Sequence, residues 1–356
     1  MKILKRILNL TLLTIILIIE LENKFYIVAG ASTGYRQELP IRIGLFTRDL
    51  NDDYIILLRK NFEDIQKNNL GKVVFTFYNA NFNQSTQNSD IENELKKGID
   101  LILLDMVNLI EIEGMINTIS QHNVPVVVFN REPFTMAPIK SYKKAFYVGT
   151  DSKQGGTIQG RMIADAWKNH KQLIDKNQDN VLQYILLIGE KLNQTAINRS
   201  AYSISTIQKA NIKIEELASP ILHWDTKSAE DTVSALFLRY GNKIEAIISN
   251  DDSMAIGAIQ ALQKYGYNLG DKEKTIVVVG LDGVSEAKDL ISKGFMLGTA
   301  SQDTADMTNT IYAVGMNLVY DRNPVEGVPY KLDETGVAIF LPYEEYTGPM
   351  FQQKIS

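Results

Sequence analysis

Residues 124–130 read Val-Pro-Val-Val-Val-Phe-Asn, and residues 276–282 read Ile-Val-Val-Val-Gly-Leu-Asp. The apolar residues are successive rather than alternating in both segments, which is typical of a strand buried on both faces of a sheet. A polar residue, Asn130 or Asp282, then follows directly. The two segments therefore predict central strands of parallel sheets with polar groups at their carboxyl ends.

Similar apolar runs recur along the chain, each followed by a stretch of helical character. Further strands are expected at 41–46, 73–77, 101–104, 182–188 and 246–249, and helices at 54–66, 152–168, 252–264 and 304–318. This alternation indicates parallel sheets connected by helical crossovers. Seven or more units of one strand and one helix are too many for a single sheet of common size. We therefore expect an α/β fold with two doubly wound lobes.

Polar side chains follow four of these strands. Asp52, Asn130, the run 250–252 and Asp282 all stand at predicted strand ends, where open α/β sheets bind their ligands. Each residue alone is equally well explained as a helix N-cap. As a set, carboxylates and amides without a Gly-rich phosphate loop suit an uncharged, polyhydroxylated ligand whose hydroxyl groups they can bind.

Composition excludes several classes of protein. The 356 residues are 45% apolar and 22% charged, as in soluble folded chains long enough for two domains. A net charge of −5 argues against general nucleic-acid binding. The lack of Cys excludes disulfides, thiolate metal sites and a lipid-modified N-terminal Cys. Because no hydrolase, nucleotide-binding or zinc motif occurs in the sequence, we expect a binding protein and not an enzyme.

The first residues have the pattern of an export signal. Three basic residues fall within 1–6, residues 7–19 are uncharged and mostly apolar, and Ala29-Gly30-Ala31 offers a cleavage site. Residues 1–31 are therefore predicted to be a cleaved signal peptide or, alternatively, a retained N-terminal anchor. Either interpretation places the protein in the periplasm or on the outer face of the cytoplasmic membrane.

Six segments together resemble the periplasmic D-galactose/D-glucose-binding proteins. They are 41–44 (Ile-Arg-Ile-Gly), 51–54 (Asn-Asp-Asp-Tyr), 124–133 (ending Asn-Arg-Glu-Pro), 147–153 (Tyr-Val-Gly-Thr-Asp-Ser-Lys), 224–226 (Trp-Asp-Thr) and 250–255 (Asn-Asp-Asp-Ser-Met-Ala). The resemblance extends from about residue 41 to 343. It implies a type I periplasmic binding protein: two Rossmann-like, doubly wound lobes, a three-segment hinge, and a monosaccharide enclosed between the lobes. The implied N-terminal lobe comprises 40–148 and 301–337, and the C-terminal lobe 149–300 and 338–350.

The resemblance also implies which residues contact the sugar. Tyr54 and Trp224 would sandwich the ring, whose apolar faces suit aromatic side chains. The implied polar contacts are Asp52, Asn130, Asn193, Thr195, Arg199, Asp251, Asp282 and Gln302.

Four of these positions depart from the family pattern and move charge within the site. Asn193 and Thr195 stand in place of His and Asp, and Asp251 and Gln302 in place of two Asn. We therefore expect a sugar similar to D-galactose or D-glucose, with xylose or another aldose or related monosaccharide as the alternative.

A second group of residues has the spacing of a calcium loop. Asp175, Asn177 and Asp179 offer side-chain oxygens at positions 1, 3 and 5, Val181 its carbonyl at 7, and Gln183 its side chain at 9. The resemblance implies a distant carboxylate that completes the site, and Glu245 stands at the matching place. The sequence predicts a structural Ca²⁺ here, and a solvated polar turn is the alternative.

The implied role is delivery of a sugar to a membrane partner. In a cell with a periplasm that partner would be an ABC permease or a chemoreceptor. A chain that kept its N-terminal anchor would instead be a tethered sugar sensor that signals to a histidine kinase. Gene repressors with similar lobes need an N-terminal helix-turn-helix, and here the signal-like segment takes its place.

Overall fold

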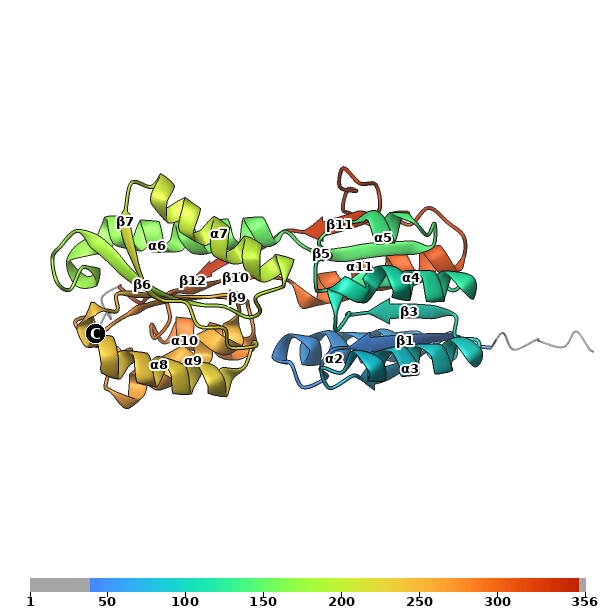
Figure 1. The fold of residues 1–356 in the computed structure, drawn as a ribbon, viewed down its shortest axis with the longest axis horizontal. Coiled ribbons are helices and arrows are strands. Elements are labelled where there is room, and N and C mark those ends of the chain that lie inside the picture. The colour runs from blue at the N-terminus through green and yellow to red at the C-terminus, as the bar shows by residue number, and fades with distance from the viewer. Residues whose placement is uncertain (1–38, 352–356) are drawn as a thin grey trace, which may run out of the picture. The chain divides into compact units, whose positions relative to one another are not determined.

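Two six-stranded sheets form the framework of the protein (Figure 1). The computed structural model describes residues 39–351, so the predicted signal segment 1–31 lies outside the described residues. The first sheet has the order β11-β5-β4-β3-β1-β2 and the second β12-β10-β9-β8-β6-β7. Every described pairing is parallel except that of β12 with β10, which is antiparallel. Two doubly wound lobes are therefore present, as the sequence predicts.

The strands and helices alternate along the chain as expected. The strands of the first sheet are β1 (Ile41–Thr47), β2 (Val73–Asn79), β3 (Leu101–Leu104), β4 (Val126–Phe129), β5 (Ala145–Thr150) and β11 (Ala338–Leu341). Those of the second are β6 (Val181–Leu187), β7 (Lys213–Ala218), β8 (Ala246–Ser249), β9 (Val277–Asp282), β10 (Gly298–Ser301) and β12 (Glu344–Thr347). The helices are α2 (Asp53–Asn68), α3 (Gln84–Lys96), α4 (Ile112–Gln121), α5 (Ala137–Lys140), α6 (Ser152–Ile174), α7 (Gln194–Lys209), α8 (Thr226–Tyr240), α9 (Asp252–Lys264), α10 (Ser285–Ser292) and α11 (Thr304–Val319), with short 3₁₀ turns η1 (Leu109–Glu111) and η2 (Gly241–Lys243). None of the helices in residues 39–351 has the length and apolar character needed to span a membrane.

Each sheet is covered by helices on both faces, and this explains the unbroken apolar runs. In β4, Val127 and Phe129 pack into one core with α2 and α11, whereas Val126 and Val128 pack into another with α3 and α4. The second sheet divides in the same way, with α6 and α7 on one face and α8, α9 and α10 on the other. Because neighbouring side chains of a strand point to opposite faces, both faces must be apolar to be buried.

The chain passes from one sheet to the other three times, between β5 and β6, β10 and β11, and β11 and β12. The third crossover differs from our expectation. β11 pairs with β5, so residues 338–341 belong to the first sheet and not to the C-terminal lobe. The change of sheet occurs at Pro342 and Tyr343, because Pro342 interrupts the run of strand residues there.

Helices α6 and α7 approach closely at glycines. A Cβ on Gly156 would lie 2.4 Å from the carbonyl oxygen of Arg199, and a Cβ on Gly160 equally close to that of Ser203. The glycine-rich segment of α6 is thus a packing surface, which lets α7 lie against it and fixes the backbone that carries Arg199.

Candidate functional site

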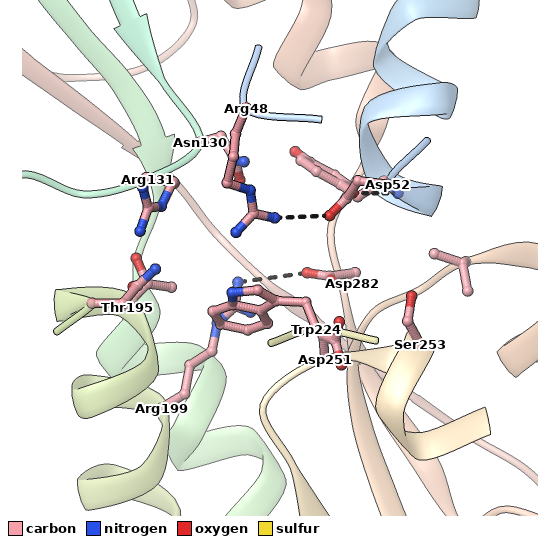
Figure 2. A pocket seen from close by; sticks show the side chains of 13 residues that line it. Arg48, Asp52, Asn130, Arg131, Thr195, Arg199, Trp224, Asp251, Ser253 and Asp282 are labelled. Carbon is pink, nitrogen blue, oxygen red and sulfur yellow. Dashed lines mark hydrogen bonds and ion pairs between the residues drawn. The ribbon is translucent and has the colours of Figure 1, made fainter. Parts of the chain in front are cut away.

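Loops at the carboxyl ends of strands from both sheets enclose a small polar cavity of about 50 Å³ (Figure 2). Its lining consists of Arg48, Asp52, Tyr54, Asn130, Arg131, Asn193, Thr195, Arg199, Trp224, Asp251, Ser253, Asp282 and Val284. The structure thus brings together every residue predicted for sugar contact except Gln302. The free space suffices for a few water molecules. A monosaccharide therefore needs the surrounding groups to move apart before it can enter.

Helix N-termini position three of these side chains. Asp52 caps α2 by accepting from Tyr54 N and Ile55 N at 3.0 and 3.1 Å. Asn193 caps α7 and Asp251 caps α9, each through one side-chain oxygen. These side chains cap a helix and line the cavity at the same time, because a cap uses one side-chain atom and leaves the other for a second contact.

On the first sheet's side, polar groups behind the lining hold it in place. Asn130 has a left-handed backbone with φ of 66° and donates from Nδ2 to the fully buried carboxylate of Asp105 at 3.4 Å. Burial raises the pKa of Asp105 to about 6, against the opposing effect of Arg48 and Arg131. Asp105 therefore orients Asn130 without itself lining the cavity.

Glu190 connects the two sides of the site. It lies after β6, and it accepts from Arg48 Nη1 at 2.8 Å and from Arg131 Nη2. Both arginines belong to the first sheet's loops and are almost completely buried. Arg48 also donates from Nη2 to Asp52 at 3.2 Å.

Sequence reasoning assigned no role to Arg48, Arg131 or Glu190. Arg131 stands within the quoted Asn-Arg-Glu-Pro segment, which was the available signal. Arg48 and Glu190 pair with each other although they lie far apart in the sequence, so no local pattern indicates their contact.

Arg199 organises the second sheet's side. Its Nη1 donates to the carbonyl of Asn250 at 2.7 Å, and its Nη2 donates to the Tyr343 hydroxyl at 2.8 Å. It also forms an ion pair with Asp282, with 3.5 Å between Nη2 and Oδ1. Because the guanidinium is a planar fork, these three partners fix its orientation.

Gln302 lies beside the cavity lining and links two residues of it. Its Oε1 accepts from the Tyr54 hydroxyl at 3.0 Å, and its Nε2 donates to Asp282 at 2.8 Å. Burial raises the pKa of Asp282 to about 8, although Arg199 opposes the rise. The structure thus places Gln302 as a positioning residue for Tyr54 and Asp282.

The Trp224 ring occupies space that is open only because residue 189 is a glycine. A Cβ on Gly189 would lie 2.3 Å from the Trp224 ring, and Trp224 itself has a positive φ of 64°. Its Nε1 is buried, forms no hydrogen bond of ordinary geometry among residues 39–351, and lies near the Glu190 carboxylate, whose pKa it helps to lower. The ring therefore presents a donor and an aromatic face at the cavity (Figure 2).

The predicted calcium loop closes on Glu245. Glu245 is buried and accepts from Lys176 N at 2.8 Å and from Gln183 N at 3.0 Å, so it touches both ends of the loop. Asp179 accepts from the side-chain amides of Asn177 and Gln183 at 2.8 and 2.7 Å. Within the described part of the chain, no three His, Cys, Asp or Glu side chains converge closely enough to hold a metal ion.

Two buried oxygens of this loop nevertheless remain unused. Asp175 Oδ1 and Gln183 Oε1 have no hydrogen-bond partner among the described residues. Burial raises the pKa of Glu245 to about 7, and the charges of Asp175 and Asp179 add to the rise. An unpartnered carboxylate oxygen and an unpartnered amide oxygen near Glu245 are hard donors of the kind that Ca²⁺ prefers.

Comparisons with known proteins identify the family and the fold. A family model described as a periplasmic binding protein domain matches residues 43–322. The D-galactose/methyl-galactoside binding periplasmic protein of Haemophilus influenzae is 34% identical over 303 residues, which cover 85% of this chain and 88% of that protein. The D-allose-binding periplasmic protein of Escherichia coli is 27% identical and covers 77% and 82% of the two chains.

Solved structures share the fold. An ABC transporter periplasmic solute-binding protein from Actinobacillus succinogenes, crystallised with D-allose, superposes with a TM-score of 0.72 at 18% identity. The match covers 87% of this chain and 98% of that one. The names of further relatives refer to ribose and D-xylose, so the relatives as a group differ in their sugar.

Proposed function

The chain belongs to the periplasmic binding protein family, and we propose that it captures a monosaccharide similar to D-galactose or D-glucose for an ABC importer. In this role the protein is exported, acts in the periplasm or on the outer face of the cytoplasmic membrane, and binds its ligand without transforming it. Its partner is the importer's permease. The similarity to the D-galactose/methyl-galactoside binding protein supports this choice of sugar over a pentose.

The observation that carries the proposal is the composition of the cavity lining. Asp52, Asn130, Arg199 and Asp282 offer acceptors and donors, and Tyr54 and Trp224 offer aromatic rings. A pyranose has a rim of hydroxyl groups and two apolar faces, so it needs both kinds of partner.

Binding is proposed to favour the closed arrangement of the two lobes. Asp52 and Asn130 come from the first sheet, whereas Arg199, Trp224 and Asp282 come from the second. A sugar that contacts both sets binds the closed form better and shifts the population toward it. The permease can then recognise the closed form as the loaded state.

A thermal-shift panel tests the proposed function. D-Galactose, D-glucose, D-allose, D-xylose and D-ribose are each added in excess to the purified chain, because a ligand that binds only the folded state raises the melting temperature. We expect the largest rise with galactose or glucose. A larger rise with a pentose contradicts the choice of sugar, and no rise with any monosaccharide contradicts sugar binding itself.

We also propose a structural Ca²⁺ in the loop 175–183. Side-chain oxygens of Asp175, Asn177, Asp179 and Gln183, the carbonyl of Val181 and the carboxylate of Glu245 would hold it. The unpartnered oxygens of Asp175 and Gln183 support this proposal. A bound cation would also offset the repulsion among the three carboxylates.

Chelation tests the calcium proposal independently of sugar binding. Removal of divalent ions is expected to lower the melting temperature, and calcium is expected to restore it. Asp175→Asn should remove the response, whereas Asp289→Asn, at an exposed carboxylate that pairs with Lys293, should keep it. Identical melting with calcium and with chelator contradicts the site.

A further inference from the structure

Three guanidinium groups and three carboxylates line the cavity, and Glu190 adds a fourth carboxylate beside them. Each guanidinium of the lining already has a carboxylate partner. Arg48 is bonded to Asp52 and Glu190, Arg131 to Glu190, and Arg199 to Asp282. Asp251 is the remaining carboxylate of the lining, and no cation within residues 39–351 forms a salt bridge with it.

Asp251 is held so that one of its oxygens is available to a ligand. Its Oδ1 accepts from Met254 N at 3.0 Å and thereby caps α9. In the described part of the chain no hydrogen bond reaches Oδ2. The residue is only 5% exposed and lines the cavity, so Oδ2 is largely removed from bulk water.

The surroundings of Asp251 are negative. Asp282 and Asp52, which also line the cavity, and Asp252 behind it all act on Asp251 through their charge. Burial, with the charge of Asp282 as a further contribution, holds the pKa of Asp251 well above its usual range. Arg199 is the nearby cation, and its two terminal nitrogens already bind Asp282, Tyr343 and the Asn250 carbonyl, whereas its Nε has no partner among the described residues. Without a counter-charge, burial favours the protonated form of this carboxyl group, and a ligand that brings a positive charge favours its ionised form.

We propose that the site prefers an aminated monosaccharide, whose protonated amino group binds Asp251, to the corresponding neutral sugar. This inference rests on the proposed function and specifies the ligand class of the same site. The ring of such a ligand keeps the contacts proposed for Asp52, Asn130, Arg199 and Trp224, and its ammonium group donates to Asp251 Oδ2. A charge-assisted hydrogen bond in a cavity screened from water is about twice as strong as a neutral one. The same contact makes Asp251 the residue that determines specificity.

Calorimetric titrations can test this inference. The purified full chain is titrated at neutral pH with D-galactose, D-glucose and their 2-amino, 3-amino and 6-amino deoxy derivatives. The wild-type chain is expected to bind at least one of the amino sugars ten or more times more tightly than its neutral parent. In Asp251→Asn that ratio should fall to about one, because Asn keeps the helix cap and can accept from a hydroxyl group but carries no charge for the ammonium group.

Asp225→Asn is the matched control. Asp225 caps α8 through Ser228 N, in the same lobe as Asp251, but does not line the cavity. This variant should keep the wild-type preference for the amino sugar. Melting curves of both variants establish that the fold is retained.

The possible failures are distinguishable. If neutral sugars bind and none of the amino derivatives binds more tightly, the inference is overturned and the proposed function stands. If an amino sugar is preferred but Asp251→Asn keeps the preference, the assignment to Asp251 is overturned. If neither class binds, the proposed function fails together with the inference.

Discussion

The carboxylate of Glu190 accepts a hydrogen bond from Arg48 Nη1 at 2.8 Å, although the two residues stand 142 positions apart and follow strands of different sheets. The same carboxylate binds Arg131, so one acidic group of the second lobe serves two buried arginines of the first. Glu190 and the two arginines form an ion cluster that requires both lobes. The closed arrangement is thus stabilised by the protein's own charges as well as by the proposed sugar.

Glu190→Gln is expected to weaken sugar binding ten- to a hundredfold. The neutral amide leaves Arg48 and Arg131 buried without a full counter-charge, and loss of one partner of a buried pair typically costs about 2–5 kcal/mol. Calorimetry on the variant measures the change. Glu345→Gln is the control, because Glu345 pairs with the exposed Arg161 and such pairs contribute about 1 kcal/mol or less. Unchanged affinity in Glu190→Gln would show that the ion cluster plays no part in closure.

Gly156→Ala should destabilise the protein by about 1–3 kcal/mol, because the added methyl would overlap the Arg199 carbonyl oxygen. It should also weaken sugar binding, since α7 carries Arg199. Gly114→Ala, in α4, is the matched change, because nothing lies within 4 Å of the added Cβ. The free energy of unfolding of Gly114→Ala should rise by up to about 1 kcal/mol, because Ala has a higher helix propensity than Gly. Denaturant unfolding measures the change in unfolding free energy for each variant. If Gly156→Ala and Gly114→Ala changed it equally, the packing role of Gly156 would be contradicted.

Asp252→Asn is expected to stabilise the protein near pH 7.5 and to have little effect near pH 4. Asp252 is fully buried, and burial raises its pKa from 3.8 to about 6. The folded state then holds a proton that the unfolded state has lost, so this group's contribution to stability falls as the pH rises from about 4 to 6. Asn resembles the protonated carboxyl group. Above about pH 6 the variant should therefore have a free energy of unfolding higher than that of the wild type by at most about 3 kcal/mol.

Unfolding free energies of wild type and Asp252→Asn across this pH range measure the difference. Asp231→Asn serves as the control, because Asp231 is exposed and pairs with Lys227 at the surface. A stability difference that does not change with pH would refute a titrating Asp252.

Gly189→Ala should weaken sugar binding at least tenfold. The new Cβ would overlap the Trp224 ring, which must then leave its place at the cavity. Tryptophan fluorescence should report the movement, since the other tryptophan, Trp167, is buried in the core of the second lobe. If the Ala variant binds sugar as the wild type does, then Trp224 is not a ligand contact.

The sequence predicts the central strands well because both of their faces are buried, which requires apolar residues at successive positions. β4 is apolar at every position and β8 at every position but its last, Ser249, and both strands are buried on both faces. The strand prediction omitted β5, β7, β10, β11 and β12, and for β7 and β12 the opposite reason holds. β7 and β12 lie at the edges of the second sheet and are largely polar and solvent-exposed, so their residues carry no burial signal. The crossover at Pro342 was misplaced because the residues of β11 do not indicate to which sheet they belong.

Site residues at strand ends could be predicted because topology brings those ends together. Asp52, Asn130, Asp251 and Asp282 belong to this group, and all four line the cavity. Arg48, Arg131 and Glu190 escaped prediction because their roles follow from a three-way ion pairing across the two sheets. No local spacing or periodicity encodes such a contact.

Small-angle X-ray scattering of the purified chain, with and without the monosaccharide that gives the largest thermal shift, tests the central claim most directly. Asp52 and Asn130 can contact the same sugar as Arg199 and Asp282 only when the two lobes are together. We predict that the radius of gyration falls when the sugar saturates the protein. Identical scattering curves in the presence and absence of a sugar that binds would contradict closure of the two lobes around the ligand.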